Sequence, residues 1–219
     1  MEGVSRVHGV HQGQPILETG EPLGKAQVAL VLVHGRGGTA EGMLPLAAEL
    51  ALPGFAYLAP QAAGNTWYPY PFLAPISNNE PELSSALAAL DNVIARLDQA
   101  GISPKHTMLL GFSQGACLVL EYMARRARRY AGVVGLSGGL IGPEGTPRDY
   151  PGSLAGTPVF LGCSDPDFHI PTEQVLHTAE ILRRLDGQVT VRLYPNMGHM
   201  VNQDEIDAVK DMMLSIATV

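Results

Sequence analysis

The chain contains little that would suit a disulfide-stabilised fold, a nucleic-acid partner or a membrane. Only two of its 219 residues are cysteine, Cys117 and Cys163, and both lie in apolar runs, which favours a reducing compartment. The formal net charge of −7 argues against nucleic acid or an anionic membrane as the main partner. No apolar run approaches a membrane span, and the first residues lack the apolar core of a signal peptide. We therefore expect a cytoplasmic protein.

Charged residues are also few, at 16% of the chain, against 46% hydrophobic residues. This balance is ordinary for a globular enzyme, and the 25 glycines and 17 prolines indicate many loops. We find no repeat or linker. A chain of 219 residues is long enough to bury one large core, so we predict a single domain over residues 1–219.

Apolar runs rich in β-formers alternate with segments of helical periodicity. Residues 28–33 (VALVLV) are apolar throughout, as expected for a strand buried on both faces. Residues 1–27 are interrupted by glycine and proline and are compatible with a short hairpin at a sheet edge. Further strands are expected at 55–59, 108–110, 132–137, 159–162 and 189–194, and helices at about 40–50, 81–99, 114–129, 172–185 and 204–216.

This alternation predicts an α/β fold with a mostly parallel central sheet, helices on both faces and no inserted lid domain. Sheets of this kind bind their ligands at the carboxyl ends of the strands. The residues of chemical interest are therefore sought in the loops that follow the strands.

Residues 111–115 (GFSQG) lie between a predicted strand and a predicted helix, which is the context of a nucleophile elbow. The two glycines allow strand and helix to pack closely beside a serine with a strained backbone. Residues 135–139 (GLSGG) match the same template, but the glycine- and proline-rich segment that follows cannot begin a helix. We therefore predict Ser113 as the nucleophile and place Ser137 at the end of a neighbouring strand.

A serine nucleophile needs a base, and the base needs an orienting acid. His199 follows the last predicted strand and is the predicted base, whereas His34 is expected to brace its own loop. Two aspartates follow the penultimate strand. Counting from the strand favours Asp165 as the acid, and counting back from the next helix favours Asp167. His169 raises the question of a metal, but no second group of ligands supports one, so neither a metal nor a cofactor is expected.

An ester carbonyl under attack needs hydrogen-bond donors for its oxyanion. The backbone N–H of Gln114, directly after the serine, is one predicted donor, and that of Arg36 in the glycine-rich segment 34–37 is the other. The Arg36 side chain is either exposed to solvent or bound to an anionic group of the substrate.

Aromatic residues gather in the loop between residues 61 and 81. They are either part of the core or the wall of an apolar acyl or alcohol pocket, and we favour the pocket. Cys117 is expected to be a small buried filler beneath the elbow, and the arginines at the far end of that helix are expected to form a solvated face. The predicted pocket residues are Trp67, Tyr68 and Phe72.

Together these motifs resemble the α/β-hydrolase superfamily, and most of all its phospholipase/carboxylesterase family, which includes acyl-protein thioesterases and small bacterial carboxylesterases. The resemblance is carried by residues 34–37 (HGRG), 64–69 (GNTWYP), 111–115, 137–139 (SGG), 167–171 (DFHIP) and 198–199 (GH). Family members place the acid three residues before a Val-Pro or similar pair, which favours Asp167. The resemblance implies a lidless, cofactor-free esterase that works through an acyl-enzyme.

The expected function is therefore that of a serine carboxylesterase acting on small, short-chain acyl esters. The segment 165–169 is longer than in acyl-protein thioesterases, which makes small esters the better substrate class than acylated proteins. Thioesterase or lysophospholipase activity with the same triad is the alternative, and a catalytically silent binding module is the alternative of another class. Relatives often pair, so a homodimer is considered, although the sequence indicates no interface.

Overall fold

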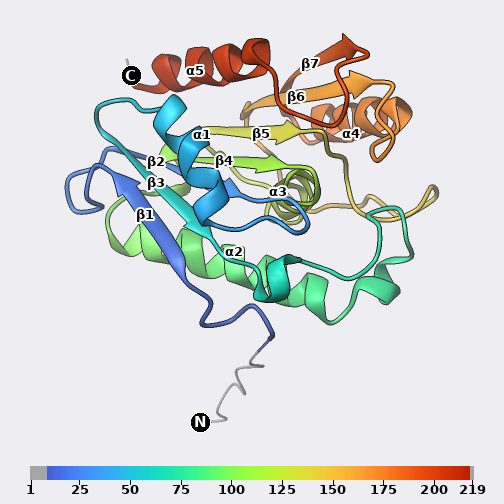
Figure 1. The fold of residues 1–219 in the computed structure, drawn as a ribbon, viewed down its shortest axis with the longest axis horizontal. Helices are drawn as coiled ribbons and strands as arrows, with labels where there is room; N and C mark the ends of the chain where they lie inside the picture. The colour runs from blue at the N-terminus through green and yellow to red at the C-terminus, as the bar shows by residue number, and fades with distance from the viewer. Residues whose placement is uncertain (1–8, 218–219) are drawn as a thin grey trace.

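The computed structural model describes residues 9–217, and its strands form one sheet that is covered by helices on both sides (Figure 1). This arrangement confirms the predicted α/β fold with a mostly parallel sheet. Four α-helices and short 3-10 turns lie between the strands, and a fifth α-helix follows the last strand, with no further helical domain inserted in the described part of the chain. The strands are β1 (Ile16–Gly20), β2 (Val28–Val33), β3 (Phe55–Pro60), β4 (Thr107–Phe112), β5 (Gly132–Leu136), β6 (Pro158–Asp165) and β7 (Gln188–Pro195), and the helices are α1 (Leu44–Glu49), α2 (Glu82–Gln99), α3 (Gln114–Arg125), α4 (Thr172–Arg184) and α5 (Gln203–Ala217).

The strand order is β1-β3-β2-β4-β5-β6-β7, and every neighbouring pair is parallel except β1 with β3. The predicted hairpin within residues 1–27 is wrong for the described part of that segment, and residues 1–8 lie outside the described residues. β1 pairs with β3, because both edges of β2 are already taken by β3 and β4. The chain progresses in opposite directions on the two sides of β2, so β2 and β4 flank a topological switch point.

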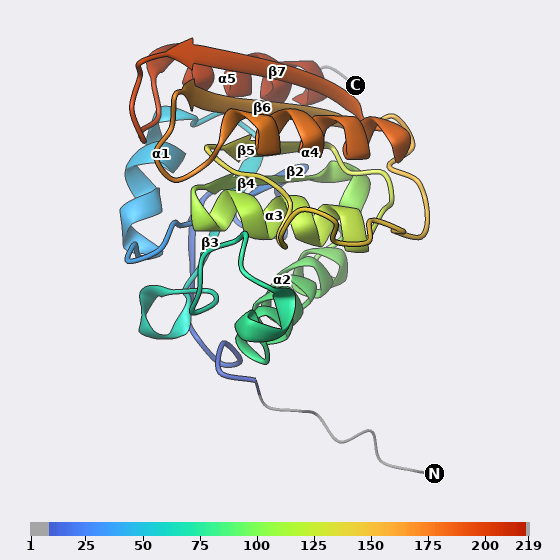
Figure 2. The same ribbon diagram turned by 90° about the vertical axis from the view of Figure 1, so that its right-hand side faces the viewer.

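The apolar run of β2 feeds two cores. Ala29, Val31 and Val33 belong to a core on the side of α2, α3 and α4. Val28, Leu30 and Leu32 belong to a second core on the side of α1 and α5. Successive side chains of a strand point to opposite faces, so a strand covered on both faces must be apolar throughout. Figure 2 shows the same division, with α2, α3 and α4 on one face of the sheet.

Three boundaries differ from the predicted ones. Helix α3 ends at Arg125 rather than at residue 129, because Arg126 leaves the helical conformation with φ of −117° and ψ of 44°. The helix predicted at about 40–50 divides into a 3-10 turn, Glu41–Met43, and the shorter α1, which has Pro45 in its first turn. Proline lacks an N–H and is accommodated only at the start of a helix, so α1 begins there. Strand β6 runs to Asp165 rather than to residue 162, because all eight of its residues pair with β7.

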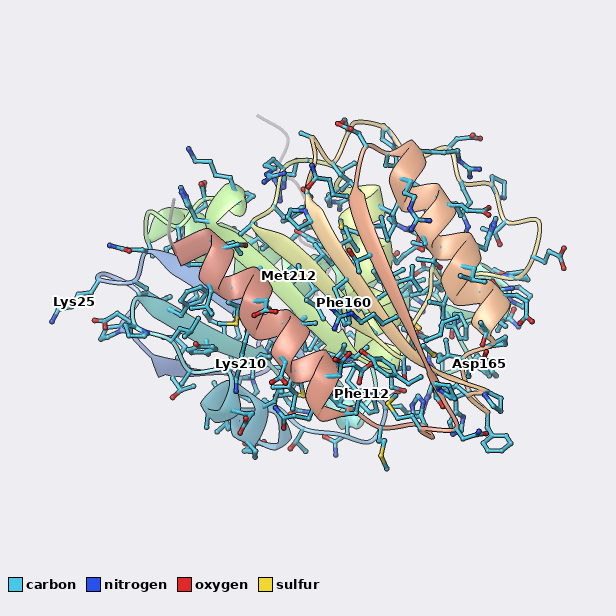
Figure 3. The ribbon with its side chains drawn as sticks, turned by 90° about the horizontal axis from the view of Figure 1, so that it is seen from above. Lys25, Phe112, Phe160, Asp165, Lys210 and Met212 are labelled. Carbon is cyan, nitrogen blue, oxygen red and sulfur yellow. The ribbon has the colours of Figure 1, made fainter. Side chains whose placement is uncertain are left out.

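The carboxyl ends of the central strands meet at one edge of the sheet. Phe112 at the end of β4 and Asp165 at the end of β6 lie at the same edge in Figure 3, whereas Lys25, which precedes β2, lies at the opposite side. The register agrees, since Val33 of β2 pairs with Gly111 and Phe112 pairs with Leu136 of β5. The loops that follow β2, β4, β6 and β7 therefore converge. Within residues 9–217, no helix has both the length and the apolar character needed to cross a bilayer.

Candidate active site

Ser113 lies between β4 and α3 with φ of 54° and ψ of −120°, a backbone conformation that L-residues rarely adopt. The flanking glycines permit it. A Cβ atom on Gly115 would lie 2.1 Å from Val33 O, and one on Gly111 would lie 2.2 Å from Gly115 O. Both positions therefore exclude a side chain, and the close approach of β2, β4 and α3 leaves Ser113 half-buried at the sheet edge.

Three residues predicted from the sequence form a continuous hydrogen-bond chain. Ser113 Oγ lies 2.8 Å from His199 Nε2, and His199 Nδ1 lies 2.8 Å from Asp167 Oδ2. With its proton on Nδ1, His199 donates to the carboxylate and accepts from the serine hydroxyl. The three side chains come from the ends of three different strands, so only the folded sheet brings them together.

Asp167 is held by backbone as well as by His199. Its Oδ1 accepts hydrogen bonds from the amides of His169, at 2.8 Å, and Ile170, at 3.1 Å. Burial by itself would raise the pKa of Asp167, but the hydrogen bonds from His199 and these two amides outweigh it and lower the pKa. Asp167 therefore stays ionised beside His199. Asp165 points elsewhere and accepts from the Thr172 hydroxyl at 3.0 Å.

The His199 ring is packed between two other rings. Its centroid lies 5.1 Å from that of Phe112 and 4.8 Å from that of His169. The loop beneath is pinned as well, because Gly198 N donates to Ser164 Oγ at 2.9 Å. These contacts fix the orientation of the imidazole toward Ser113.

The amides of Arg36 and Gln114 are free to serve a ligand. Neither donates to another group of residues 9–217, since Gln114 is the first residue of α3 and Arg36 lies in the loop after β2. The loop abuts the serine, because a Cβ atom on Gly35 would lie 3.2 Å from Ser113 Cβ. The helix dipole of α3 also favours negative charge at this point.

His34 braces the same loop, as predicted. Its Nδ1–H donates to Gly35 O at 2.8 Å, and its Nε2 accepts from Ala62 N at 3.1 Å. Burial lowers the pKa of His34, which keeps the imidazole neutral. Ser137 directly follows β5 and is fully buried, so it has no access to a substrate.

A cavity of about 550 Å³ opens beside Ser113. The predicted pocket residues Tyr68 and Phe72 line it, but Trp67 does not. Trp67 is fully buried, its indole N–H donates to His34 O at 2.9 Å, and the rings of His11 and His34 flank it. The indole N–H finds its acceptor only in the interior, so Trp67 belongs to the core. The lining residues are Arg36, Tyr68, Pro69, Pro71, Phe72, Ser113, Gln114, Cys117, His169, Ile170 and His199.

His169 and Ile170 also line the cavity and were not predicted to do so. Their positions could have indicated this, because they directly follow the acid in the loop after β6, at the edge of the sheet where ligands bind. Cys117 is buried as expected, but it also reaches the cavity. Burial raises the pKa of its thiol to about 12. No group of three or more potential metal ligands occurs among the residues that the structure describes.

The Arg36 side chain is exposed, which was one of the two alternatives considered for it, but it is not free in solvent. Its Nη atoms donate to the Thr66 hydroxyl and to the carbonyl oxygens of Tyr68, Pro69 and Tyr70, at 2.9–3.1 Å. The sequence offered no signal for these bonds, because all four acceptors lie about thirty positions away and three of them are backbone atoms. The arginines at the far end of α3 lie in a mostly exposed cluster, with Arg125 and Arg126 paired to Glu121 and Asp91.

Comparison with known proteins finds relatives by fold and by sequence. A structure of a phospholipase/carboxylesterase from Dyadobacter fermentans DSM 18053 superposes with a TM-score of 0.88 at 42% identity, over 92% of this chain and 96% of that one. NocK of Nocardia uniformis subsp. tsuyamanensis, which is named as an esterase, is 31% identical to this chain. The match covers 86% of this chain and 49% of the length of NocK. Acyl-protein thioesterase 1 of Gibberella zeae is 31% identical over 54% of this chain and 52% of its own.

This chain spans about half the length of the curated relatives that it matches. The model of one protein family, described as phospholipase/carboxylesterase, matches residues 14–216, which is nearly the whole of the described chain. The protein therefore belongs to the phospholipase/carboxylesterase family.

Proposed function

We propose that this protein is a serine carboxylesterase that hydrolyses small, short-chain acyl esters through an acyl-enzyme. The observation that carries the proposal is the hydrogen-bonded chain from Ser113 through His199 to Asp167, with Ser113 and His199 lining a cavity. Membership of the phospholipase/carboxylesterase family supports it. A nucleophile, a base and an orienting acid in this relation are the parts that acyl transfer requires.

In the first half-reaction, His199 Nε2 takes the proton of Ser113 Oγ as the oxygen attacks the ester carbonyl carbon. The carbonyl π electrons move to the carbonyl oxygen, whose negative charge accepts hydrogen bonds from the Gln114 and Arg36 amides. Asp167, kept ionised by its own hydrogen bonds, stabilises the imidazolium. The tetrahedral intermediate then collapses, the C–O bond breaks, and His199 gives its proton to the departing alcohol.

In the second half-reaction, water occupies the place of the alcohol. His199 takes a proton from this water, and the hydroxide attacks the acyl carbon on Ser113. The same two amides stabilise the second oxyanion. Collapse breaks the acyl–serine bond, returns the proton to Ser113 Oγ and releases the carboxylic acid.

The volume and lining of the cavity support a small, largely apolar substrate. Its volume of about 550 Å³ falls within the usual range for a small-molecule site. Tyr68, Phe72 and Ile170 supply apolar surface. Thioesters are a second candidate class, because relatives of this chain are named acyl-protein thioesterases and the same triad would cleave them. The cytoplasmic location, the single domain over residues 1–219 and a homodimer stay predictions.

A chain-length series of p-nitrophenyl esters and acyl thioesters tests the proposal, with the Ser113→Ala variant beside the wild type. We expect turnover to peak at short acyl esters and kcat to fall by at least about 10⁴-fold in the variant. A fluorophosphonate should label the wild type but not the variant.

Undiminished ester hydrolysis by the Ser113→Ala variant would refute the proposal. Absence of both turnover and fluorophosphonate labelling in the wild type would instead favour a silent binding module. Turnover that peaks on thioesters would mean that thioesters, not short esters, are the preferred substrates, and would leave the proposed triad unchanged.

A further inference from the structure

The segment 66–70, which walls the cavity, is held by the side chain of Arg36. Nη1 donates to Thr66 Oγ1 at 3.1 Å and to Pro69 O at 2.9 Å. Nη2 donates to Tyr68 O and Tyr70 O, both at 2.9 Å. A guanidinium has four Nη–H donors, so all four are engaged and only Nε–H is left over. An anionic substrate group could reach the Nη atoms only by displacing bonds to the segment.

A second side chain holds the same segment from the other side. Gln114 Oε1 accepts from Trp67 N at 2.9 Å, and Gln114 Nε2 donates to Tyr68 O at 2.8 Å. Tyr68 O therefore accepts from both Arg36 and Gln114, and the Thr66 hydroxyl lies 3.2 Å from it as well. Gln114, Tyr68 and Trp67 are buried, so an unmade bond here would go unsatisfied.

The same two residues carry the amides that face the reacting carbonyl in the proposed mechanism. The loop after β2 is also joined directly to this part of the chain, because Gly37 N donates to Asn65 O at 2.7 Å and the Trp67 indole N–H donates to His34 O at 2.9 Å. The segment 66–70 contributes Tyr68 and Pro69 to the lining of the cavity. The cavity wall and the two amides therefore form one hydrogen-bonded unit.

We propose that the side chains of Arg36 and Gln114 are positioning groups that lock the cavity wall to the oxyanion-binding amides. Through this lock, the fit of the acyl group against Tyr68 and Pro69 sets the alignment of the amides with the carbonyl oxygen. Arg36 then determines kcat and the acyl preference without touching the substrate through its guanidinium. This inference rests on the proposed esterase function.

The test uses Arg36→Ala and Arg36→Lys, with Arg96→Ala as the control. Arg96 is an exposed arginine of α2 that pairs with Glu18 at the surface. A displacement of the amides by a fraction of an ångström weakens their hydrogen bonds to the transition state more than those to the ground state. We therefore expect Arg36→Ala to lower kcat on the best short ester by about 10- to 100-fold, with KM within about threefold. The affinity for a trifluoromethyl ketone inhibitor should fall in parallel.

Ethylguanidinium replaces the missing part of the side chain and should restore much of the kcat of Arg36→Ala. Lysine should restore little, because one ammonium cannot reach four acceptors on a curved segment. The Arg96→Ala control should match the wild type in every measurement. Unchanged kcat in Arg36→Ala, a rise in KM alone, full activity of Arg36→Lys or failure of ethylguanidinium would each overturn the inference.

Trp67 is the only tryptophan of the chain, and its backbone N–H donates to Gln114 Oε1. Its fluorescence therefore reports whether the segment 66–70 is held in place, independently of enzyme activity. Acrylamide quenching of Trp67 should rise in Arg36→Ala and return with ethylguanidinium. An inactive wild type with this quenching pattern would refute the esterase function and leave the lock standing. If Arg36→Ala does not fold, Gln114→Met serves as the second variant, and unchanged kcat and quenching in it would overturn the inference.

Discussion

Arg36 and Gln114 both donate a side-chain hydrogen bond to the carbonyl oxygen of Tyr68, at 2.9 and 2.8 Å. Arg36 lies in the loop after β2 and Gln114 is the first residue of α3. They also share the Thr66 hydroxyl, which accepts from Arg36 Nη1 at 3.1 Å and lies 3.2 Å from Gln114 Oε1. Residues that share a partner are expected to act as one unit when either is changed. Behind the reacting atoms, the site therefore contains a set of coupled hydrogen bonds that holds the cavity wall.

A double-mutant cycle with Arg36→Lys and Gln114→Met should show this coupling. Either change alone loosens the segment 66–70, so the second change has less left to disturb. We expect the effects on kcat/KM to be non-additive by about 0.5–3 kcal/mol. The pair Arg36→Lys with Arg96→Ala is the matched control and should be additive within about 0.5 kcal/mol. Full additivity in the first pair would mean that Tyr68 O does not link the two side chains.

The two aspartates after β6 should separate cleanly in kinetics. Asp167→Asn keeps the shape of the side chain but removes the charge beside His199 Nδ1, so kcat/KM on a short ester should fall by about 10³- to 10⁴-fold. Asp165→Asn removes only a partner of Thr172, and its kcat/KM should stay within about threefold of wild type. A larger loss in Asp165→Asn than in Asp167→Asn would mean that Asp165, and not Asp167, is the acid of the triad.

Glu205 should make the protein less stable as the pH rises. Its carboxyl is buried at the start of α5, where Oε2 accepts from Asn202 N at 2.9 Å and Oε1 has no partner within residues 9–217. Burial raises the pKa of Glu205 from 4.5 to about 7, and the nearby charge of Asp204 adds to this. The folded state thus holds the proton more tightly than the unfolded state, so stability falls between these two pH values and stays low above them.

Urea unfolding of the wild type and Glu205→Gln across this range measures the effect. Glutamine keeps the acceptor for Asn202 N but cannot ionise. Between pH 4.5 and 8, the variant should gain up to about 3 kcal/mol in free energy of unfolding relative to the wild type. Other titrating groups are common to both proteins and cancel in the difference. Parallel pH profiles would mean that Glu205 is ionised without penalty.

Both cysteines should be inert in the folded protein. Burial raises the pKa of each thiol, Cys117 and Cys163, to about 12, so almost no thiolate exists near neutral pH. A thiol reagent such as DTNB at pH 8 should react with neither in the native state and with both in urea. Rapid labelling of either thiol in the native state would contradict this prediction.

The sequence by itself determined the features that depend on neighbouring residues. The unbroken apolar run of β2 predicted a strand covered on both faces, and both cores now account for it. The Gly-x-Ser-x-Gly context selected Ser113 over Ser137, because whether a helix can begin is a local property. His199 could also be predicted from the sequence, because it lies in the loop after a predicted parallel strand, and such loops lie at the ligand-binding edge of the sheet.

Only the tertiary structure decided which distant groups each side chain meets. Counting along the chain left both Asp165 and Asp167 open and the family resemblance favoured Asp167, but the hydrogen bond to His199 decides between them. Trp67 and Tyr68 are adjacent in the chain and both are buried in the core, yet only Tyr68 also lines the cavity. The Arg36 guanidinium found backbone acceptors in a distant loop. Periodicity and composition describe a residue's neighbours along the chain, whereas these bonds depend on the positions of whole loops around the sheet.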